Sequence, residues 1–260
     1  MRSVGRVQIG KAAAPVSHIC QAYPDRVDVR GRDLCGDLMG RLSFTEYFHL
    51  LLTGQEPTED QRFFLDVLLV SIAEHGMMPT NVAARMTLAA DPGSLQGALA
   101  AGILGAGPVI LGTSELCARL LEEAGSSGRP PREIVEEIHA TGGKVPGFGH
   151  PVHRPLDPRA ERILELADAR GAGGAHVALA REFRGAVAEA WGRPLTMNVS
   201  MPIAAVTLDL GFPSSMAKAI PLLARTAGLL AHLVEEQQHP AGFAMAAAAE
   251  HAVAYEPEAE

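Results

Sequence analysis

The chain has 260 residues, of which 47% are hydrophobic and 20% are charged. This balance provides for a sizeable folded core and argues against bulk disorder. The formal net charge of -8 argues against nucleic acid as the main partner.

Alanine and leucine, both strong helix formers, dominate the chain, and alternating strand patterns are few. We therefore expect a nearly all-helical protein. In chain order, helices are expected over 44–52, 59–75, 81–90, 95–104, 114–123, 132–140, 157–170, 177–191 and 214–238. Ser43 is the expected N-cap of the first helix, Pro79 is expected to interrupt the chain before the third, and Pro221 predicts a kink in the last.

Two segments have the apolar character of a membrane span. Residues 92–114 carry no charge, but their glycines and proline predict a buried helix that ends in a turn. The apolar run 219–234 contains Arg225 and His232, which disfavours a span. The N-terminal residues also lack the continuous apolar core of a secretion signal. We expect no membrane partner.

The three cysteines, Cys20, Cys35 and Cys117, are widely spaced. Their odd number and spacing fit neither a disulfide framework nor a zinc site, so we expect reduced thiols in a cytoplasmic protein. Two glycine-rich breaks, near 124–128 and 171–174, bracket a middle segment of different character. A split architecture follows, with an outer domain built from both chain ends and an inserted middle domain.

The most distinctive stretch is GGKVPGFGHPVHRPLDPRAERI, residues 142–163. His150 lies between Gly149 and Pro151, and glycine and proline together suit a loop with one fixed shape. An imidazole beside guanidinium groups suits a substrate with carboxylates and a proton to move. The alternative is a surface loop rich in turn formers. His153 forms a His-x-x-His pair with His150, but no third ligand is evident, so we expect no metal.

Five blocks in order resemble the citrate synthase superfamily, and most closely its short citryl-CoA lyase-like members. The blocks are VRGRDLCGDL with SFTEYFHLLLTGQEPT, AEHGMMPTNVAAR, PGFGHPVHRPLDPRA, MNVSMPIAAVTLDLGFP and LLARTAGLLAHLVEE. The resemblance implies an all-α, two-domain fold and a homodimer. Residues 1–116 and 209–260 would form a large helical domain, and 117–208 a small inserted helical domain that carries the His150 loop. The active site would lie in the cleft between the domains.

The resemblance also implies an enzyme that makes or breaks a carbon–carbon bond between acetyl-CoA and a 2-oxo acid such as oxaloacetate. That chemistry needs a group for the hydroxyl proton, donors for the enolate oxygen, an acid–base group at the acetyl carbon and cations for carboxylates. His150 matches the histidine at the oxo or hydroxyl oxygen, where we expect it to handle that proton. The expected substrate-binding residues are His75, Arg159 and Arg225.

Coenzyme A, as part of the substrate thioester, is the cofactor that the resemblance implies. Lys144, Val145, Phe148 and Gly149 lie where the family's loop meets the CoA nucleotide. Arg225 also carries an argument from the residues alone, because a lone charge within an apolar helical stretch is costly without a partner.

Two positions depart from the family's pattern. In GPVILGTSE, Ile110 stands where the family's HGGANE-like motif has a catalytic histidine. In Asn-Val-Ser, the candidate catalytic residue Ser200 stands where the family has a carboxylate, and a hydroxyl is a poor general base unless another group activates it. Asp209, nine residues on, is expected to face elsewhere. We consider the backbone N–H groups of the glycine turn, for example that of Gly112, as substitute donors to the enolate oxygen.

Three alternatives remain open. In the first, the chain is a citryl-CoA lyase-like enzyme in which His150 and water transfer the protons. In the second, it is an enzyme for a different hydroxyacyl-CoA or 2-oxo acid, with Ile110 and Met201 lining an apolar acyl pocket. In the third, it is a catalytically silent dimer that binds CoA esters or organic acids.

The family's C-terminal arginine, which reaches into the partner's site, is not recognisable, since no arginine follows Arg225.

Overall fold

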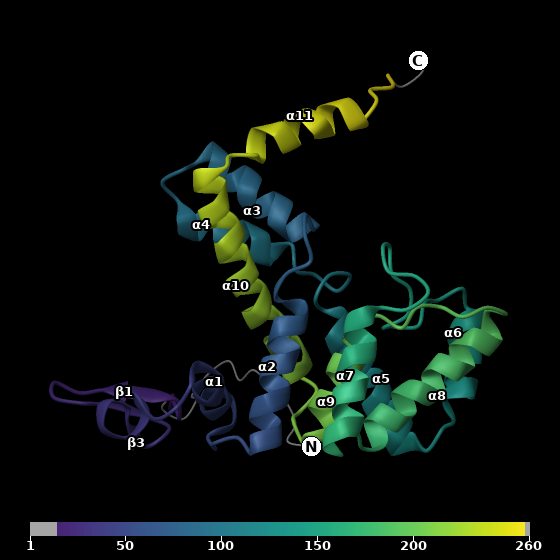
Figure 1. Cartoon of the computed structure of the whole chain (residues 1–260), viewed down its shortest axis with the longest axis horizontal. Coiled ribbons are helices and arrows are strands. Elements are labelled where there is room, and N and C mark those ends of the chain that lie inside the picture. The colour runs from purple at the N-terminus through teal and green to yellow at the C-terminus, as the bar shows by residue number, and fades with distance from the viewer. Residues whose placement is uncertain (1–14, 258–260) are drawn as a thin grey trace. The chain divides into compact units, whose positions relative to one another are not determined.

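The computed structural model describes residues 15–257 and divides into two compact units, Met1–Arg62 and Phe63–Glu260. The predicted insertion of 117–208 into a larger domain stays a prediction. The all-α prediction is confirmed in substance, because helices form most of the described chain (Figure 1).

The first unit holds a three-stranded antiparallel sheet that the sequence did not indicate. Its strands are β1 (Cys20–Ala22), β2 (Val27–Val29) and β3 (Arg32–Asp33), in the order β1-β2-β3. Cys20 pairs with Val29 and Asp28 with Asp33. Strands of two or three residues are too short to show alternation, which explains why the pattern missed them.

A π-helical segment, Leu34–Leu38, and α1 (Phe44–Thr53) complete the first unit. The expected N-cap at Ser43 is confirmed, because its hydroxyl accepts from the N–H of Glu46, whose carboxylate accepts from the N–H of Ser43. Val29, Leu38 and Leu50 form the small core of this unit.

Helix α2 (Glu59–Ala73) leads into the second unit. The helices that follow are α3 (Pro79–Ala90), α4 (Leu95–Leu104), α5 (Thr113–Ser127), α6 (Pro131–Ala140), α7 (Pro158–Arg170), α8 (Ala175–Ala190), α9 (Ser200–Asp209), α10 (Met216–Gln238) and α11 (Gly242–Ala252). All nine predicted helices are present. Pro79 begins α3 rather than interrupting the chain before it, since the first helical position needs no backbone N–H.

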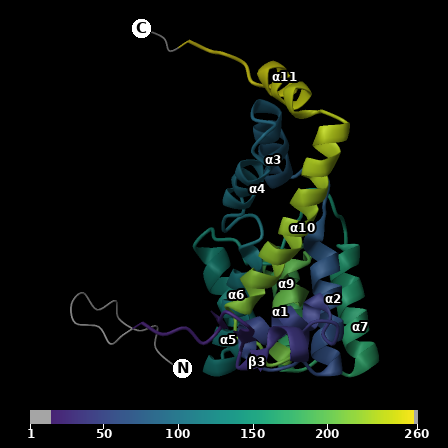
Figure 2. The same ribbon diagram turned by 90° about the vertical axis from the view of Figure 1, so that its left-hand side faces the viewer.

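The second unit contains two groups of packed helices joined by α10. Helices α3 and α4 pack on each other and on α10, and α11 packs on α3 (Figure 2). In the other group, α9 packs against α5, α7 and α8, and α6 packs on α8. Every residue of α9 from Ser200 to Leu208 is buried. A helix buried on all sides has no amphipathic period, which is why the sequence did not reveal it.

Within residues 15–257, α10 is the one helix long and apolar enough, by length and composition, to cross a membrane. Half of its apolar window is buried inside the protein. It packs on α3, α4 and α5 and carries Arg225 and Glu236 in buried positions. The buried apolar residues of α10 therefore form part of the helical core.

Asp209 faces away from the site, as expected, and holds the start of α8. Its carboxylate accepts from the backbone N–H groups of Gly174 (2.8 Å), His176 (2.9 Å) and Val177 (2.9 Å). It also contacts the His176 ring at 2.8 Å. N–H groups at the start of a helix have no acceptor within the helix, and here the Asp209 carboxylate accepts their hydrogen bonds. The helix dipole also favours the negative charge of Asp209 at this end.

We expect Asp209→Ala to lower the free energy of unfolding by about 1–3 kcal/mol, because it leaves several N–H groups without an acceptor. Asp209→Asn keeps one acceptor oxygen and is expected to lose less. Urea unfolding of the three proteins measures the difference. An unchanged unfolding midpoint in Asp209→Ala would contradict this role.

Candidate active site

A cavity of about 360 Å³ in the second unit brings together all five predicted catalytic and substrate-binding residues. These are His75, His150, Arg159, Ser200 and Arg225. They come from the segment after α2, from the loop before α7, from α7 itself, from the start of α9 and from α10. Residues far apart in sequence therefore meet, as the order of the motifs predicted.

The loop that carries His150 is fixed by its glycines and by a neighbouring segment. Gly147 and Gly149 have φ values of +84° and +91°, which side-chain-bearing residues rarely adopt. The N–H of Gly149 donates to Thr196 O at 2.7 Å, and the N–H of Asn198 donates to Gly147 O at 2.9 Å. A Cβ on Gly147 would lie 2.8 Å from Cys117 Sγ. These contacts tie the loop to residues 196–198 and leave no room for a side chain at Gly147.

The hydrogen bonds of His150 define its tautomer. Its Nδ1 accepts from the backbone N–H groups of Val152 (3.1 Å) and His153 (2.8 Å). The neutral ring therefore carries its proton on Nε2. The contact from Arg159 to that nitrogen is long, at 3.5 Å, and the two shorter bonds to Nδ1 outweigh it. Burial and the neighbouring His153 lower the pKa of His150, so the ring is neutral at pH 7. His150 thus presents an N–H donor to the cavity.

His75 lies against both histidines of the loop. Its Nε2 is 3.1 Å from Nε2 of His153, and its ring centroid is 5.3 Å from that of His150. Burial, followed by the positive charge of Arg159, lowers the pKa of His75. Sequence reasoning considered His153 only as a metal ligand. Its contact with His75 joins residues 78 positions apart in the sequence, and no local pattern reveals such a contact.

The three histidines are close enough to hold a metal ion, with one ligand atom from each within 4.8 Å of the others. A metal-bound histidine donates its other ring N–H to an acceptor. His150 does the reverse, because its Nδ1 accepts two N–H groups and its proton occupies Nε2. Arg159 and Arg225 line the same cavity and repel a cation. That no metal binds stays a prediction, now with this physical reason.

Arg159 is held by a buried carboxylate. Its Nε and Nη2 donate to Asp157 at 3.0 and 2.9 Å. Asp157 also accepts from the N–H groups of Arg159 and Val199, which ties the start of α7 to the start of α9. Burial opposes ionisation of Asp157, but the bonds from Arg159 outweigh it, so the pKa of Asp157 lies below its ordinary value. Arg159 is therefore positioned before any ligand binds.

Arg225 is a buried cation that forms no ion pair within the described residues, although the charge of Glu74 acts on it from further away. Only 3% of its surface is exposed, and it donates to Asn81 Oδ1 at 3.2 Å and to Ile72 O at 3.3 Å. Its Nε has no hydrogen-bond partner, and no ion pair reaches it within residues 15–257. Burial lowers the pKa of Arg225. An arginine remains charged in proteins, so this guanidinium calls for an anion in the cavity.

The two departures from the family's pattern both face the cavity. Ile110 lines it and offers no proton. Ser200 is 8% exposed, and within the described residues neither an imidazole nor a carboxylate hydrogen-bonds to its hydroxyl. Ser200 is thus not activated as a base. The idea that Gly112 serves the enolate oxygen is wrong, because its N–H already donates to Ile110 O at 2.8 Å and to Gly107 O at 3.2 Å.

The expected CoA region is only partly at the cavity. Gly149 lines it, and Phe148 pairs with Met197 beside it. Lys144 is exposed, whereas Val145 is 3% exposed, so that its side chain packs inside the protein. These assignments stay predictions. Met201 is fully buried and does not line the cavity, which corrects its expected place in an acyl pocket.

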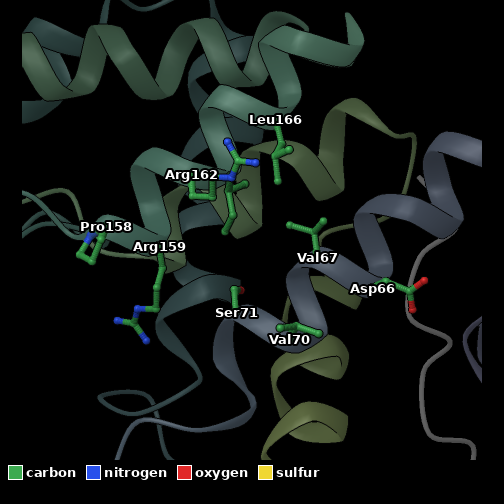
Figure 3. A pocket seen from close by; sticks show the side chains of 9 residues that line it. Asp66, Val67, Val70, Ser71, Pro158, Arg159, Arg162 and Leu166 are labelled. Carbon is green, nitrogen blue, oxygen red and sulfur yellow. The ribbon is translucent and has the colours of Figure 1, made fainter.

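A second cavity, of about 560 Å³, lies between α2 and α7. Figure 3 shows Val67 and Val70 of α2 facing Arg162 and Leu166 of α7, with Arg159 at one end. Its lining is almost entirely apolar and holds no histidine. The smaller cavity, which holds the two histidines, shares Arg159 with this groove.

Comparison with known proteins identifies the class. Residues 15–242 match the family model described as citrate synthase, C-terminal domain, so the chain belongs to the citrate synthase family. A Mycobacterium tuberculosis relative is 30% identical over 91% of this chain and 63% of its own length. The citrate synthase of Synechocystis is 33% identical over 75% of this chain and 50% of its own length. The chain thus spans between half and about two thirds of these curated relatives.

Solved structures are similar over nearly the whole chain. The citryl-CoA lyase of Hydrogenobacter thermophilus has a TM-score of 0.86 and 31% identity, covering 95% of this chain and 96% of that one. The ATP citrate lyase of Methanothrix soehngenii, in complex with citrate and coenzyme A, has a TM-score of 0.79 at 21% identity and covers 97% of this chain and 43% of its own. The second match supports the fold alone. Together they confirm the citrate synthase-like fold.

Proposed function

We propose that this protein is an enzyme that cleaves, or in reverse forms, the carbon–carbon bond between acetyl-CoA and a 2-oxo acid such as oxaloacetate. We further propose that it acts in the manner of a citryl-CoA lyase, as a homodimer in the cytoplasm. The observation that carries this proposal is the buried, unpaired guanidinium of Arg225 in one cavity with Arg159 and His150. The likeness to a citryl-CoA lyase over 95% of the chain supports it.

Each group has a task in the cleavage direction. Arg159 and Arg225 bind carboxylates of the citryl group, because guanidinium groups hold carboxylates with charge-assisted hydrogen bonds. His150 donates its Nε2–H to the oxygen of the hydroxyl carbon and stabilises the negative charge that develops there. The hydroxyl O–H bond breaks and its proton passes, in net, to water; the carbon–carbon bond breaks, its electron pair forms the thioester enolate, and the hydroxyl carbon becomes the oxo carbon. The enolate carbon takes a proton from water, because Ile110 and Ser200 supply none.

The same groups can take part in the reverse reaction, but that reaction needs a further group that the site lacks. His150 would polarise the carbonyl of the oxo acid, but removal of a proton from the acetyl carbon needs a base. Neither Ile110 nor the hydroxyl of Ser200 is one. We therefore expect cleavage to be faster than condensation.

The test is to incubate the pure protein with citryl-CoA and follow oxaloacetate with a coupled dehydrogenase. Acetyl-CoA plus oxaloacetate is run in parallel and followed by the consumption of oxaloacetate and the formation of citryl-CoA. We expect turnover in the cleavage assay. Binding of CoA by calorimetry with no turnover in either direction would instead favour the silent binding protein, for which the inert side chains at positions 110 and 200 are the specific observation.

We expect Ser200→Asp to raise the rate of condensation by about 10²-fold, because it places a base at the cavity wall at the start of α9. Ser200→Asn is the matched control, with similar size and no charge, and is expected to give no gain. Initial rates of oxaloacetate consumption in the presence of acetyl-CoA measure the effect. Equal rates for the two variants, with CoA binding intact, would show that position 200 does not face the acetyl carbon.

A further inference from the structure

His153 has no task in the mechanism above, yet it contacts both histidines that line the cavity. Its Nε2 is 3.1 Å from Nε2 of His75, and its ring stacks on that of His150 with centroids 4.4 Å apart. His75 and His150 line the cavity, whereas His153 does not. It is half-buried.

The contacts of His153 determine which ring nitrogen of His75 and which of His150 remains available to a ligand. Its backbone N–H occupies Nδ1 of His150, which leaves the Nε2–H of His150 for the cavity. Its ring occupies Nε2 of His75. No hydrogen bond reaches Nδ1 of His75 from the part of the chain that the structure describes. Nδ1 of His75 is therefore the imidazole nitrogen that can accept a proton from a bound substrate.

We propose that His75 and His153 form a proton relay that takes the hydroxyl proton during cleavage. In the resting pair, His75 carries its proton on Nε2 and His153 carries its own on Nδ1. As the substrate O–H bond breaks, its proton moves to Nδ1 of His75, and the Nε2 proton of His75 moves to Nε2 of His153. The oxygen becomes the oxo group as the carbon–carbon bond breaks. His153 then releases one proton to water, and the enolate carbon takes one from water.

This relay rests on the proposed function and supplies the acceptor that the site otherwise lacks. His150 does not serve as that acceptor, because its Nε2 already carries a proton. His153 does not line the cavity, so it acts through His75 and is a positioning and relay residue.

The charges around the pair couple its protonation to ligand binding. Arg159 from α7 and Arg225 from α10 disfavour a proton on His75, whereas Asp157 favours one. Glu74, next in sequence, accepts from the backbone N–H of His75 at 2.8 Å. A bound dicarboxylate neutralises the two guanidinium groups and favours a proton on the pair. Binding should therefore draw a proton from the buffer.

The first test is calorimetric titration with oxaloacetate near pH 7 in buffers of different ionisation enthalpy. We expect the wild-type protein to take up about 0.5–1 proton per site on binding. His153→Gln keeps a hydrogen-bonding group toward His75 but removes one of the two imidazoles that can share the proton, so its uptake should fall at least about 2-fold, with Kd changed by less than about 3-fold. His251→Gln, at an exposed position of α11, is the matched control and should behave as the wild type. Uptake in His153→Gln equal to that of the wild type would overturn the relay.

The second test is the cleavage rate with citryl-CoA. We expect kcat to fall by about 10²–10⁴-fold in both His153→Gln and His153→Phe, with KM little changed. A wild-type kcat in His153→Gln alone would mean that His153 only orients His75, which would overturn the proton transfer. The calorimetric test needs no turnover. A wild-type protein that takes up the proton without cleaving citryl-CoA would sink the proposed function and leave the proton-sharing pair standing.

Discussion

Arg225→Met is expected to raise the thermal stability of the protein while it weakens the binding of oxaloacetate. The guanidinium is 3% exposed, forms no ion pair within residues 15–257 and donates hydrogen bonds only to neutral groups, Asn81 and Ile72 O. Methionine fills similar volume without the desolvated charge, so we expect a gain of about 1–3 kcal/mol in the free energy of unfolding. The loss of hydrogen bonds to a carboxylate should weaken binding by about 10–100-fold.

Thermal unfolding and calorimetric titration measure the two effects in the same preparation. Arg162→Met is the matched control, because Arg162 lies on the same second unit but pairs with Glu165 at the surface, with 66% of its side chain exposed. We expect it to change neither quantity appreciably, since exposed ion pairs contribute little. A destabilised Arg225→Met variant with unchanged affinity would show that Arg225 is structural.

Arg85→Met is expected to have the opposite effect on stability, with a loss of about 3–5 kcal/mol. Arg85 is 2% exposed and donates through Nε to Glu236 at 2.7 Å, through Nη1 to Glu235, and through Nη2 to His239 O at 3.2 Å. Glu236 is 3% exposed and also accepts from the N–H groups that begin α11. Removal of Arg85 alone strands a buried carboxylate.

The double variant Arg85→Met/Glu236→Gln tests that cause. Glutamine keeps an oxygen for the N–H groups of Ala241 and Gly242 and removes the charge, so most of the loss should be recovered. Urea unfolding at pH 7 gives the three free energies. A double variant as unstable as Arg85→Met would contradict the stranded-charge explanation.

The pH dependence of stability provides a second test of the Arg85–Glu236 pair. Burial opposes ionisation of Glu236, but bonds from the α11 backbone and from Arg85 outweigh it, so its pKa lies below the ordinary value of about 4.5. A lowered folded-state pKa contributes stability that is present above the unfolded pKa and is lost as the pH falls through the folded one. The difference between the wild type and Arg85→Met should therefore be largest near neutral pH and shrink below about pH 4.5.

Much of this site could be predicted because its residues lie in ordered motifs. His75, His150, Arg159 and Arg225 were each placed by the block that contains them, and all line one cavity. That the His150 loop has one fixed shape stays a prediction from its glycines and prolines. Helix α4 was predicted with its observed bounds because a charge-free stretch ends at a glycine turn.

What the sequence left out depends on contacts between distant segments. The tautomer of His150 is set by two backbone N–H groups whose direction no pattern reveals. The N–H of Gly112 was taken as available, whereas the turn itself uses it. The pairing of Arg85 with Glu236 joins residues 151 positions apart, and α9 is buried on every side. Local periodicity carries no information of this kind.

A crystal structure of the protein with oxaloacetate bound tests the central claim most directly. The account predicts carboxylate oxygens on the guanidinium groups of Arg159 and Arg225, and the oxo oxygen at about 2.6–3.2 Å from Nε2 of His150. A ligand bound outside this cavity, or one whose oxo oxygen points away from His150 while Arg225 stays unpaired, would contradict it.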